Sequence, residues 1–462
     1  MVPFSMSMNA PTFDRRAILA AGTLQLGLLP TSVRASANGD SPRARACILI
    51  FLDGGPSQID LLDPKPDAPG EVRSPFRPIQ TSAEGVEVTD LLPLTARQMH
   101  RCCVVRSMHH QEMVHDPAVY QALTGRPHRN TGGNLVVDPT DFPQIGTVFQ
   151  ALSARPSPLP KAIELPETMK MGGRVLPGQG AGFLGAPLDP YRIQLSANGV
   201  PEQPDLVPSP SNHAGRGVRR SQLLALVDRA AAPGREASDF TELQKKALDL
   251  LSRSDLTAAL DLGSEKQSTR ERYGRHRHGQ SLLMARRLVE RGAPFVSVYW
   301  GREEQDWADG KGRRLANNPW DTHRNHFPLV RDDLTPRADQ ALSALLVDLG
   351  ERGLLDSTLV LWMGEFGRSP LISDFASREH WPYAYSLLLA GAGVPGGTVW
   401  GKTDAWAGQI VENPVTPADL AATVLALMGV DPQTALEDRS GHRHLAASGR
   451  PISHLMGRRA AG

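Results

Sequence analysis

Residues 47–60 read Cys-Ile-Leu-Ile-Phe-Leu-Asp-Gly-Gly-Pro-Ser-Gln-Ile-Asp. The six leading apolar residues, soon followed by Gly and Pro, are too few for a typical globular helix. They suit a strand that is buried on both faces. Asp53 then stands at the carboxyl end of this strand, which is where ligands bind in an open α/β sheet. The sequence leaves two interpretations of Asp53: a turn carboxylate that caps the following segment, or a metal ligand.

The rest of the chain alternates strand patterns with helix patterns. Apolar runs predict further strands over residues 102–105, 295–299, 358–363 and 386–390. Helices with a Pro in the first turn and a Gly just beyond the end are expected over residues 117–123, 335–352 and 416–428. This alternation predicts an α/β fold with a doubly wound, mainly parallel sheet that helices cover on both faces.

One helical stretch interrupts the alternation, at about residues 217–292, and is predicted to be an insertion. Within it, residues 275–278 (Arg-His-Arg-His) are expected to form a solvated basic face.

The first 37 residues have the three parts of an export signal. Arg15 and Arg16 precede an apolar run over residues 17–29, and Ala35-Ser36-Ala37 resembles a cleavage site. Paired arginines predict recognition by the twin-arginine machinery, which exports folded proteins, so we expect residues 38–462 to be periplasmic or secreted. The alternative is a frayed basic N-terminus. The apolar run is too short to span a membrane comfortably, and no transmembrane segment is expected in the mature chain.

Charge and cysteine content narrow the function classes. The 50 basic and 49 acidic residues nearly cancel, which gives no electrostatic footprint for nucleic acid or an anionic membrane. The three cysteines have no zinc-type spacing and are expected to be buried thiols.

Acidic and histidine residues follow the predicted strands. Because loops at one edge of a parallel sheet converge, we expect five of these residues to share one crevice. They are Asp53, Asp321, His323, Glu365 and His380. Mixed carboxylate and imidazole ligands suit zinc, manganese or a similar ion, and a pair of such ions can clamp a phosphate or sulfate. The sequence therefore predicts one or two divalent metal ions.

These motifs resemble a known family as a set. Together with residues 123–126 (Leu-Thr-Gly-Arg), 364–370 and 379–382, they are similar to the bacterial DUF1501 family over nearly the whole mature chain. That family resembles sulfatases of the alkaline phosphatase superfamily. The resemblance implies a doubly wound α/β hydrolase with a metal pair at the strand ends.

Carrying the superfamily pattern over by position assigns roles. It implies a first metal site made by Asp321, His323 and His380, and a second made by Asp53 and Glu365, with His115 as a further ligand. Sulfatases have a nucleophilic Cys or Ser nine residues before the Thr of the Leu-Thr-Gly-Arg turn, and this chain has His115 there. The formylglycine route of sulfatases is therefore closed at this position. Phe366 also replaces a histidine that the superfamily often has.

Three residues remain as candidates for the chemistry itself. Ser57 is a candidate nucleophile at a helix start, or else an N-cap. Arg368 is a candidate for bidentate binding of an anionic oxygen, or else an ion-pair partner of a loop carboxylate. If a metal brings the pKa of its bound water near neutral, no protein nucleophile is needed, and His115 becomes a ligand or a general acid.

Two classes of function remain after this. The leading hypothesis is an exported metal-dependent hydrolase of phosphate or sulfate esters, with an anionic ester as substrate. The alternative is a catalytically inactive sulfatase-like protein that binds anionic polysaccharide or an envelope partner. A third possibility is a structural component of an envelope assembly.

Overall fold

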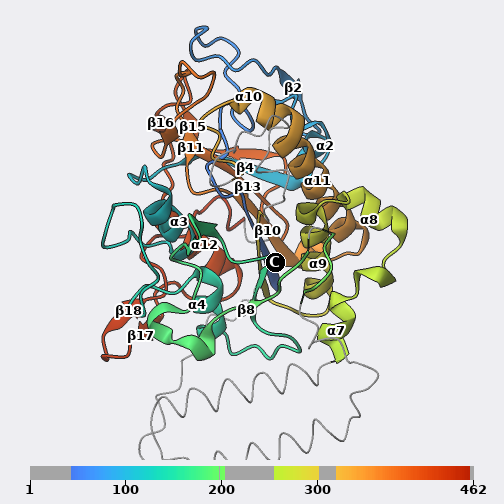
Figure 1. Ribbon diagram of the computed structural model, residues 1–462, viewed down its shortest axis with the longest axis vertical. Coiled ribbons are helices and arrows are strands. Elements are labelled where there is room, and N and C mark those ends of the chain that lie inside the picture. The colour runs from blue at the N-terminus through green and yellow to red at the C-terminus, as the bar shows by residue number, and fades with distance from the viewer. Residues whose placement is uncertain (1–42, 197, 203–253, 301–318, 458–462) are drawn as a thin grey trace, which may run out of the picture. The chain divides into compact units, whose positions relative to one another are not determined.

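A central eight-stranded sheet organises the protein, seen here in a computed structural model that describes residues 43–196, 198–202, 254–300 and 319–457 (Figure 1). These residues belong to one structural unit, Asp40–Gly462. The strand order is β14 (Thr398–Trp400), β4 (Cys102–Met108), β13 (Tyr385–Ala390), β10 (Thr358–Met363), β1 (Ala46–Phe51), β9 (Phe295–Tyr299), β5 (Ala162–Leu165) and β8 (Tyr191–Arg192).

Parallel pairing dominates this sheet, as predicted. β1 pairs in parallel with β10 on one side and β9 on the other. Among the described strands of the sheet, the antiparallel pairs are those that β13 makes with β10 and β4. Residues 364–384, between β10 and β13, form a hairpin and no crossover helix, so the chain returns along the sheet in the opposite direction.

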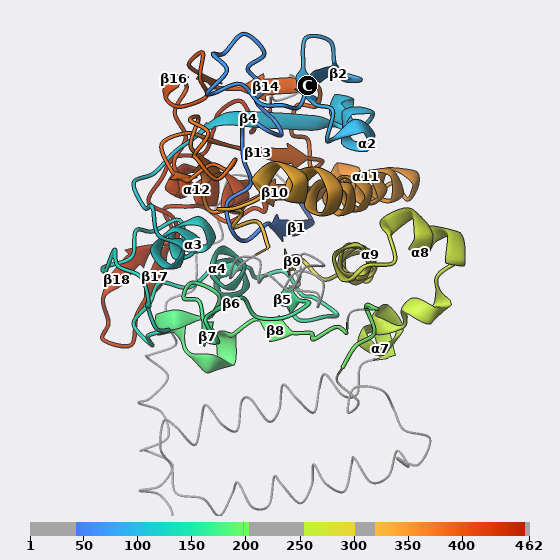
Figure 2. The same cartoon turned by 45° about the horizontal axis from the view of Figure 1, so that its top comes forward.

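β1 is buried on both faces, as the apolar run predicts. Ile48 and Ile50 belong to one hydrophobic core, whereas Leu49 and Phe51 belong to the other. Figure 2 shows one group of helices on each face of the sheet. One group contains α3 (His115–Thr124), α4 (Ile145–Leu152) and α12 (Pro417–Leu427). The other contains α7 (Ser254–Leu260), α8 (Gln267–Tyr273), α9 (Arg277–Glu290) and α11 (Thr335–Glu351). The doubly wound α/β prediction is confirmed.

Several boundaries differ from the sequence prediction. α3 begins two residues earlier than expected, at His115, and β4 continues to Met108. The short strands β5, β8 and β14 and the helix α4 are absent from the prediction. Short segments such as Ala162–Leu165 carry too little apolar periodicity to be recognised without their neighbours.

The described part of the predicted helical insertion is helical, with α7, α8 and α9. Residues 217–253 of that insertion and the predicted signal peptide 1–37 lie outside the described residues. The expected basic face over residues 275–278 is wrong. Arg277 is buried and pairs with Glu167, and buried His278 stacks on Trp300.

Short hairpins and single helical turns lie outside the central sheet. The two-stranded hairpins are β2 (Pro78–Gln80) with β3 (Glu87–Thr89), β6 (Lys170–Met171) with β7 (Arg174–Val175), β11 (Gly367–Arg368) with β12 (His380–Trp381), β15 (Lys402–Thr403) with β16 (Ile410–Glu412), and β17 (Ala435–Glu437) with β18 (Arg443–Leu445). α2 (Pro93–Ala96) and α10 (His326–Leu329) are single turns, and a π-helical turn (Val330–Leu334) joins α10 to α11. All three cysteines are free and buried. Over the described ranges, no helix combines the length and apolarity that crossing a bilayer requires.

Candidate metal centre

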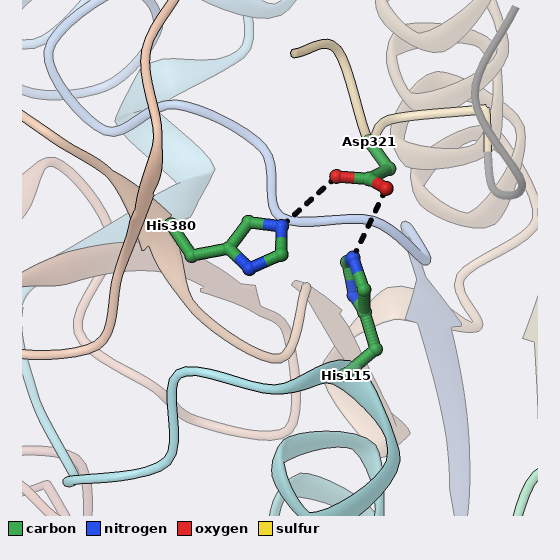
Figure 3. A group of neighbouring side chains, drawn as sticks. All are labelled: His115, Asp321 and His380. Carbon is green, nitrogen blue, oxygen red and sulfur yellow. Dashed lines mark hydrogen bonds and ion pairs between the residues drawn. The ribbon is translucent and has the colours of Figure 1, made fainter. Parts of the chain in front are cut away.

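Three side chains from distant parts of the chain meet at one edge of the sheet (Figure 3). His115 is the first residue of α3, Asp321 lies in the connection after β9, and His380 begins β12. Each offers one ligand atom, and these atoms lie within 4.8 Å of one another. His323 joins them, with its Nε2 2.9 Å from Asp321 Oδ1. The structure thus brings together four residues that the sequence singled out.

Each of the three imidazoles has its Nδ1 committed to an oxygen acceptor. His115 Nδ1 lies 2.7 Å from Glu365 Oε1, and His323 Nδ1 lies 2.7 Å from Glu379 Oε2. His380 Nδ1 lies 2.8 Å from the carbonyl oxygen of Met113. A carbonyl or an ionised carboxylate can only accept, so Nδ1 donates in each case. In a neutral ring, Nε2 then carries a lone pair.

The three Nε2 atoms face the carboxylate of Asp321. His115 Nε2 lies 3.2 Å from Oδ2, and His380 Nε2 lies 2.9 Å from Oδ1. The Nε2 atoms of His323 and His380 are 2.9 Å apart. Lone pairs so close to one another and to a carboxylate repel unless a proton or a cation lies among them. Imidazole and carboxylate groups are ligands of zinc and similar metals, and the Nδ1 of such a histidine usually donates to an oxygen atom as it does here. These residues therefore fit a divalent cation.

The shifted pKa values of His115 and Asp321 also indicate a place for a cation. Burial alone would lower the pKa of His115, but hydrogen bonds and charge from Asp321 and Glu365 outweigh burial and raise this pKa to about 9. Burial would raise the pKa of Asp321, and its contacts with His115, His323 and His380 instead hold that pKa far below its ordinary value. The carboxylates of Asp321 and Glu365 therefore stabilise a positive charge among the histidines.

Glu365 adds a further ligand atom. This fully buried side chain uses Oε1 to accept from Gly54 N at 2.9 Å and from His115 Nδ1. Its Oε2 is buried without a hydrogen-bond partner among the described residues. A buried carboxylate oxygen in that state is costly, and a cation would satisfy it. Asp53 is also buried at the end of β1, where its carbonyl accepts from Trp320 N.

Arg368 contacts the candidate metal centre through a buried guanidinium. Its buried guanidinium pairs with Asp321 Oδ1 at 2.9 Å, which is the ion-pair interpretation left open by the sequence. The remaining donors contact backbone carbonyls, those of Gly54, Gly55, Trp320 and Arg378. Three acceptors surround Nη2, whereas Nε and Nη1 each contact one. Arg368 is fully buried and therefore positions Asp321 and the loop after β1.

Ser57 belongs to a hydrogen-bond network around Asp60, apart from the candidate metal centre. Its hydroxyl donates to Asp60 Oδ2 at 2.5 Å, and Asp60 N lies 3.4 Å from Ser57 Oγ in return. Asp60 also pairs with buried Arg378 and His326. The contacts of Ser57 thus match the capping interpretation, and its hydroxyl is engaged away from the histidines.

Sequence reasoning did not predict three contacts of the site. Glu379 contacts His323 and the Met113 carbonyl contacts His380. Phe366 packs against both His115 and His380, with ring centroids 5.0 and 4.4 Å away. Glu379 stands next to His380 in sequence, which is a usable signal for an acid at the site. A backbone carbonyl gives no sequence signal at all.

Several solved structures are similar to this chain. The phosphonate monoester hydrolase SpPMH from Silicibacter pomeroyi is 11% identical, with 90% of this chain and 78% of that chain covered and a TM-score of 0.39. A putative sulfatase from Bacteroides thetaiotaomicron is 11% identical, with coverages of 91% and 76% and a TM-score of 0.39. A protein of the alkaline phosphatase superfamily from Vibrio parahaemolyticus is 12% identical, with coverages of 97% and 80% and a TM-score of 0.41.

No curated protein matches the sequence. A family model described as "Protein of unknown function (DUF1501)" matches residues 44–456. This match takes in every strand of the central sheet and all the residues of the candidate metal centre. The chain belongs to the DUF1501 family.

Proposed function

We propose that this protein is an exported, metal-dependent hydrolase of phosphate or sulfate esters. The observation that carries the proposal is the convergence of three Nε2 atoms on Asp321 while each Nδ1 is committed elsewhere. His115, His323, His380 and Asp321 would hold the first cation. Glu365 and Asp53 are candidates for a second. A bound divalent cation supplies Lewis acidity toward an ester oxygen and lowers the pKa of its water.

The residues around the candidate metal centre differ in their exposure to solvent. Arg368 and Glu365 are fully buried, so they fix Asp321 and His115 and exclude water there. The side chains of His323 and Glu379 are 37% and 56% exposed. An anionic ester would therefore approach along His323. Glu379, bound to His323 Nδ1, keeps the ring oriented.

The nucleophile in this proposal is water. In the described chain, none of the side chains that hydrogen bond or pair with His115, Asp321, His323 or His380 carries a hydroxyl or a thiol. Direct attack by water suits a site without a serine or cysteine nucleophile.

Metal content is the first test. Elemental analysis of purified residues 38–462 should find at least one divalent ion per chain, and Asp321→Ala and His380→Ala should lose it. His100→Ala, at an exposed histidine, is the control. Less than one ion per chain in wild-type protein would overturn the metal centre. Turnover of 4-nitrophenyl phosphate and 4-nitrophenyl sulfate then tests the reaction and separates the two esters.

The second candidate function is a catalytically inactive protein that binds anionic polysaccharide or an envelope partner. It is favoured by Arg368, which is fully buried and paired with Asp321, and by Phe366, which stands where the superfamily often has a histidine. Turnover that disappears in folded Asp321→Ala and His380→Ala protein would exclude it.

Export forms a separate part of the proposal, supported by the sequence of residues 1–37. Replacing Arg15 and Arg16 with lysine should leave precursor in the cytoplasm, whereas the wild-type protein should reach the periplasm or the medium. Cell fractionation measures this. Equal export of both forms would contradict recognition by the twin-arginine machinery.

A further inference from the structure

A cavity of about 240 Å³ lies at the far end of α3 from the candidate metal centre. Its lining includes Tyr120 of α3, Arg126 just beyond that helix, Phe142, Phe183 and His444. His115 begins α3. At 1.5 Å rise per residue, Tyr120 lies about 7.5 Å further along the helix axis, and Arg126 follows the end of the helix. The cavity is therefore a second place at which a ligand could bind, separate from the residues that would hold a metal.

Aromatic rings form its walls. Phe142 and Phe183 meet edge to face with centroids 5.4 Å apart, and His444 stacks on Phe183 at 4.9 Å. The guanidinium of Arg126 lies 4.7 Å from the centroid of Phe142. His444 thus covers one face of Phe183 and Arg126 one face of Phe142, and the rest of this aromatic wall can pack against a ring-shaped ligand.

A positive charge that has no carboxylate partner in the described part of the chain lies beside these rings. Arg126 is half buried, donates through Nη2 to the Leu445 carbonyl at 2.6 Å, and has an Nε without a hydrogen-bond partner among the described residues. Arg129, the other arginine of the cavity, is already neutralised by Asp138 at 2.5 Å. Burial lowers the pKa of Arg126, which is the direction for a cation that lacks a carboxylate partner.

A buried histidine also remains unsatisfied. His128 is 7% exposed, and its Nε2 has no hydrogen bond within the described ranges, although Asp141 Oδ1 lies 3.5 Å away. Asp141 is the acidic side chain of the lining. The cavity thus offers a cationic group, an aromatic wall and a carboxylate that can accept from a hydroxyl.

We propose that this cavity binds a single sugar ring that carries a sulfate, phosphate or carboxylate group. The anion would pair with Arg126, the ring would pack on Phe183, and a ring hydroxyl would donate to Asp141. The volume is below the range of about 300–1,000 Å³ for drug-sized ligands, which limits the occupant to one ring. This inference does not rest on the proposed hydrolase activity.

Calorimetric titration in EDTA tests the proposal, because it measures binding without metal-dependent turnover. Glucose 6-sulfate is the probe, and glucose and inorganic sulfate are its two halves. We expect glucose 6-sulfate to bind at least about tenfold more tightly than either half. Arg126→Gln and Phe183→Leu should each weaken it by about tenfold or more. Arg97→Gln, which removes an exposed arginine outside the cavity, should change the affinity less than twofold.

Three outcomes would overturn the proposal. They are no binding of glucose 6-sulfate, equal binding of inorganic sulfate, and equal binding of glucose. If Arg126→Gln fails to fold because the contact with Leu445 is lost, Phe183→Leu still decides. Asp321→Ala should bind the probe as wild type does, so failure of the metal centre and failure of this cavity give different results.

Discussion

Glu365 links two parts of the candidate centre through one oxygen atom. Its Oε1 accepts from Gly54 N, in the loop after β1, and from His115 Nδ1, at the start of α3. The carboxylate therefore orients the imidazole and makes its Nε2 a better donor to a cation. The sequence assigned Glu365 to direct metal binding, and the contact with His115 adds a supporting role.

Removing the charge of Glu365 tests that role. We expect Glu365→Gln to weaken divalent metal binding by about 10- to 100-fold, because the amide no longer raises the basicity of His115. Competition with a chromogenic chelator measures the affinity. The matched change Glu379→Gln should have a smaller effect, since water can replace this exposed partner of His323. Unchanged affinity in Glu365→Gln would contradict the role.

The raised pKa of His115 predicts how metal-free protein responds to pH. The folded pKa of about 9 exceeds the ordinary value of about 6.5. The contribution of His115 to stability is therefore complete below about pH 6.5 and is lost as pH rises through about 9. Urea unfolding of EDTA-treated protein between pH 6 and 10 measures this loss.

Metal binding should show the opposite dependence on pH, because a cation must displace the His115 proton. The affinity should rise by about tenfold per pH unit up to about pH 9. His115→Gln should flatten both pH profiles. A stability that rises between pH 7 and 9 in EDTA would contradict the assigned protonation.

At the scale of elements, the sequence predicts those helix starts and strands that neighbouring residues in the sequence determine. The helix start at Thr416 is an example, because the structure contains the full capping box: Asp419 N donates to Thr416 Oγ1, and Thr416 N donates to Asp419 Oδ2. β9 and β10 also match their predicted ranges. By contrast, the burial of residues 277 and 278 follows from packing on Trp300 and pairing with Glu167, neighbours that local sequence does not reveal.

The capping box gives a prediction for the helix itself. We expect Thr416→Ala to lower the free energy of unfolding by about 1 kcal/mol, because Asp419 N loses its acceptor. Thr416→Ser keeps the oxygen and should remain near wild type. Urea unfolding at constant pH measures both. A loss as large in the serine variant would assign the effect to the methyl group of Thr416 and not to the cap.

At the scale of the whole molecule, ligands of an open α/β sheet bind at the carboxyl ends of its strands. This explains why most residues of the candidate metal centre could be predicted from the sequence. Asp321, Glu365 and His380 follow strands whose carboxyl ends face one edge, so their convergence follows from topology. Which atoms face one another does not follow from topology. The tautomers depend on Met113 O, Glu365 and Glu379, whose positions are set by tertiary packing.

The candidate metal would join three segments that are far apart in sequence, α3, the connection after β9, and β12. A cation that binds only the folded chain stabilises it by RT ln(1 + [L]/Kd), or about 2.7 kcal/mol at a hundredfold excess over Kd. We therefore expect EDTA to lower Tm and added zinc or manganese to restore it in a concentration-dependent way. Asp321→Ala should start at a low Tm and respond to neither treatment, whereas His100→Ala should respond as wild type does. An equal response in Asp321→Ala would show that the stabilising cation binds elsewhere, because this carboxylate contacts all three histidines.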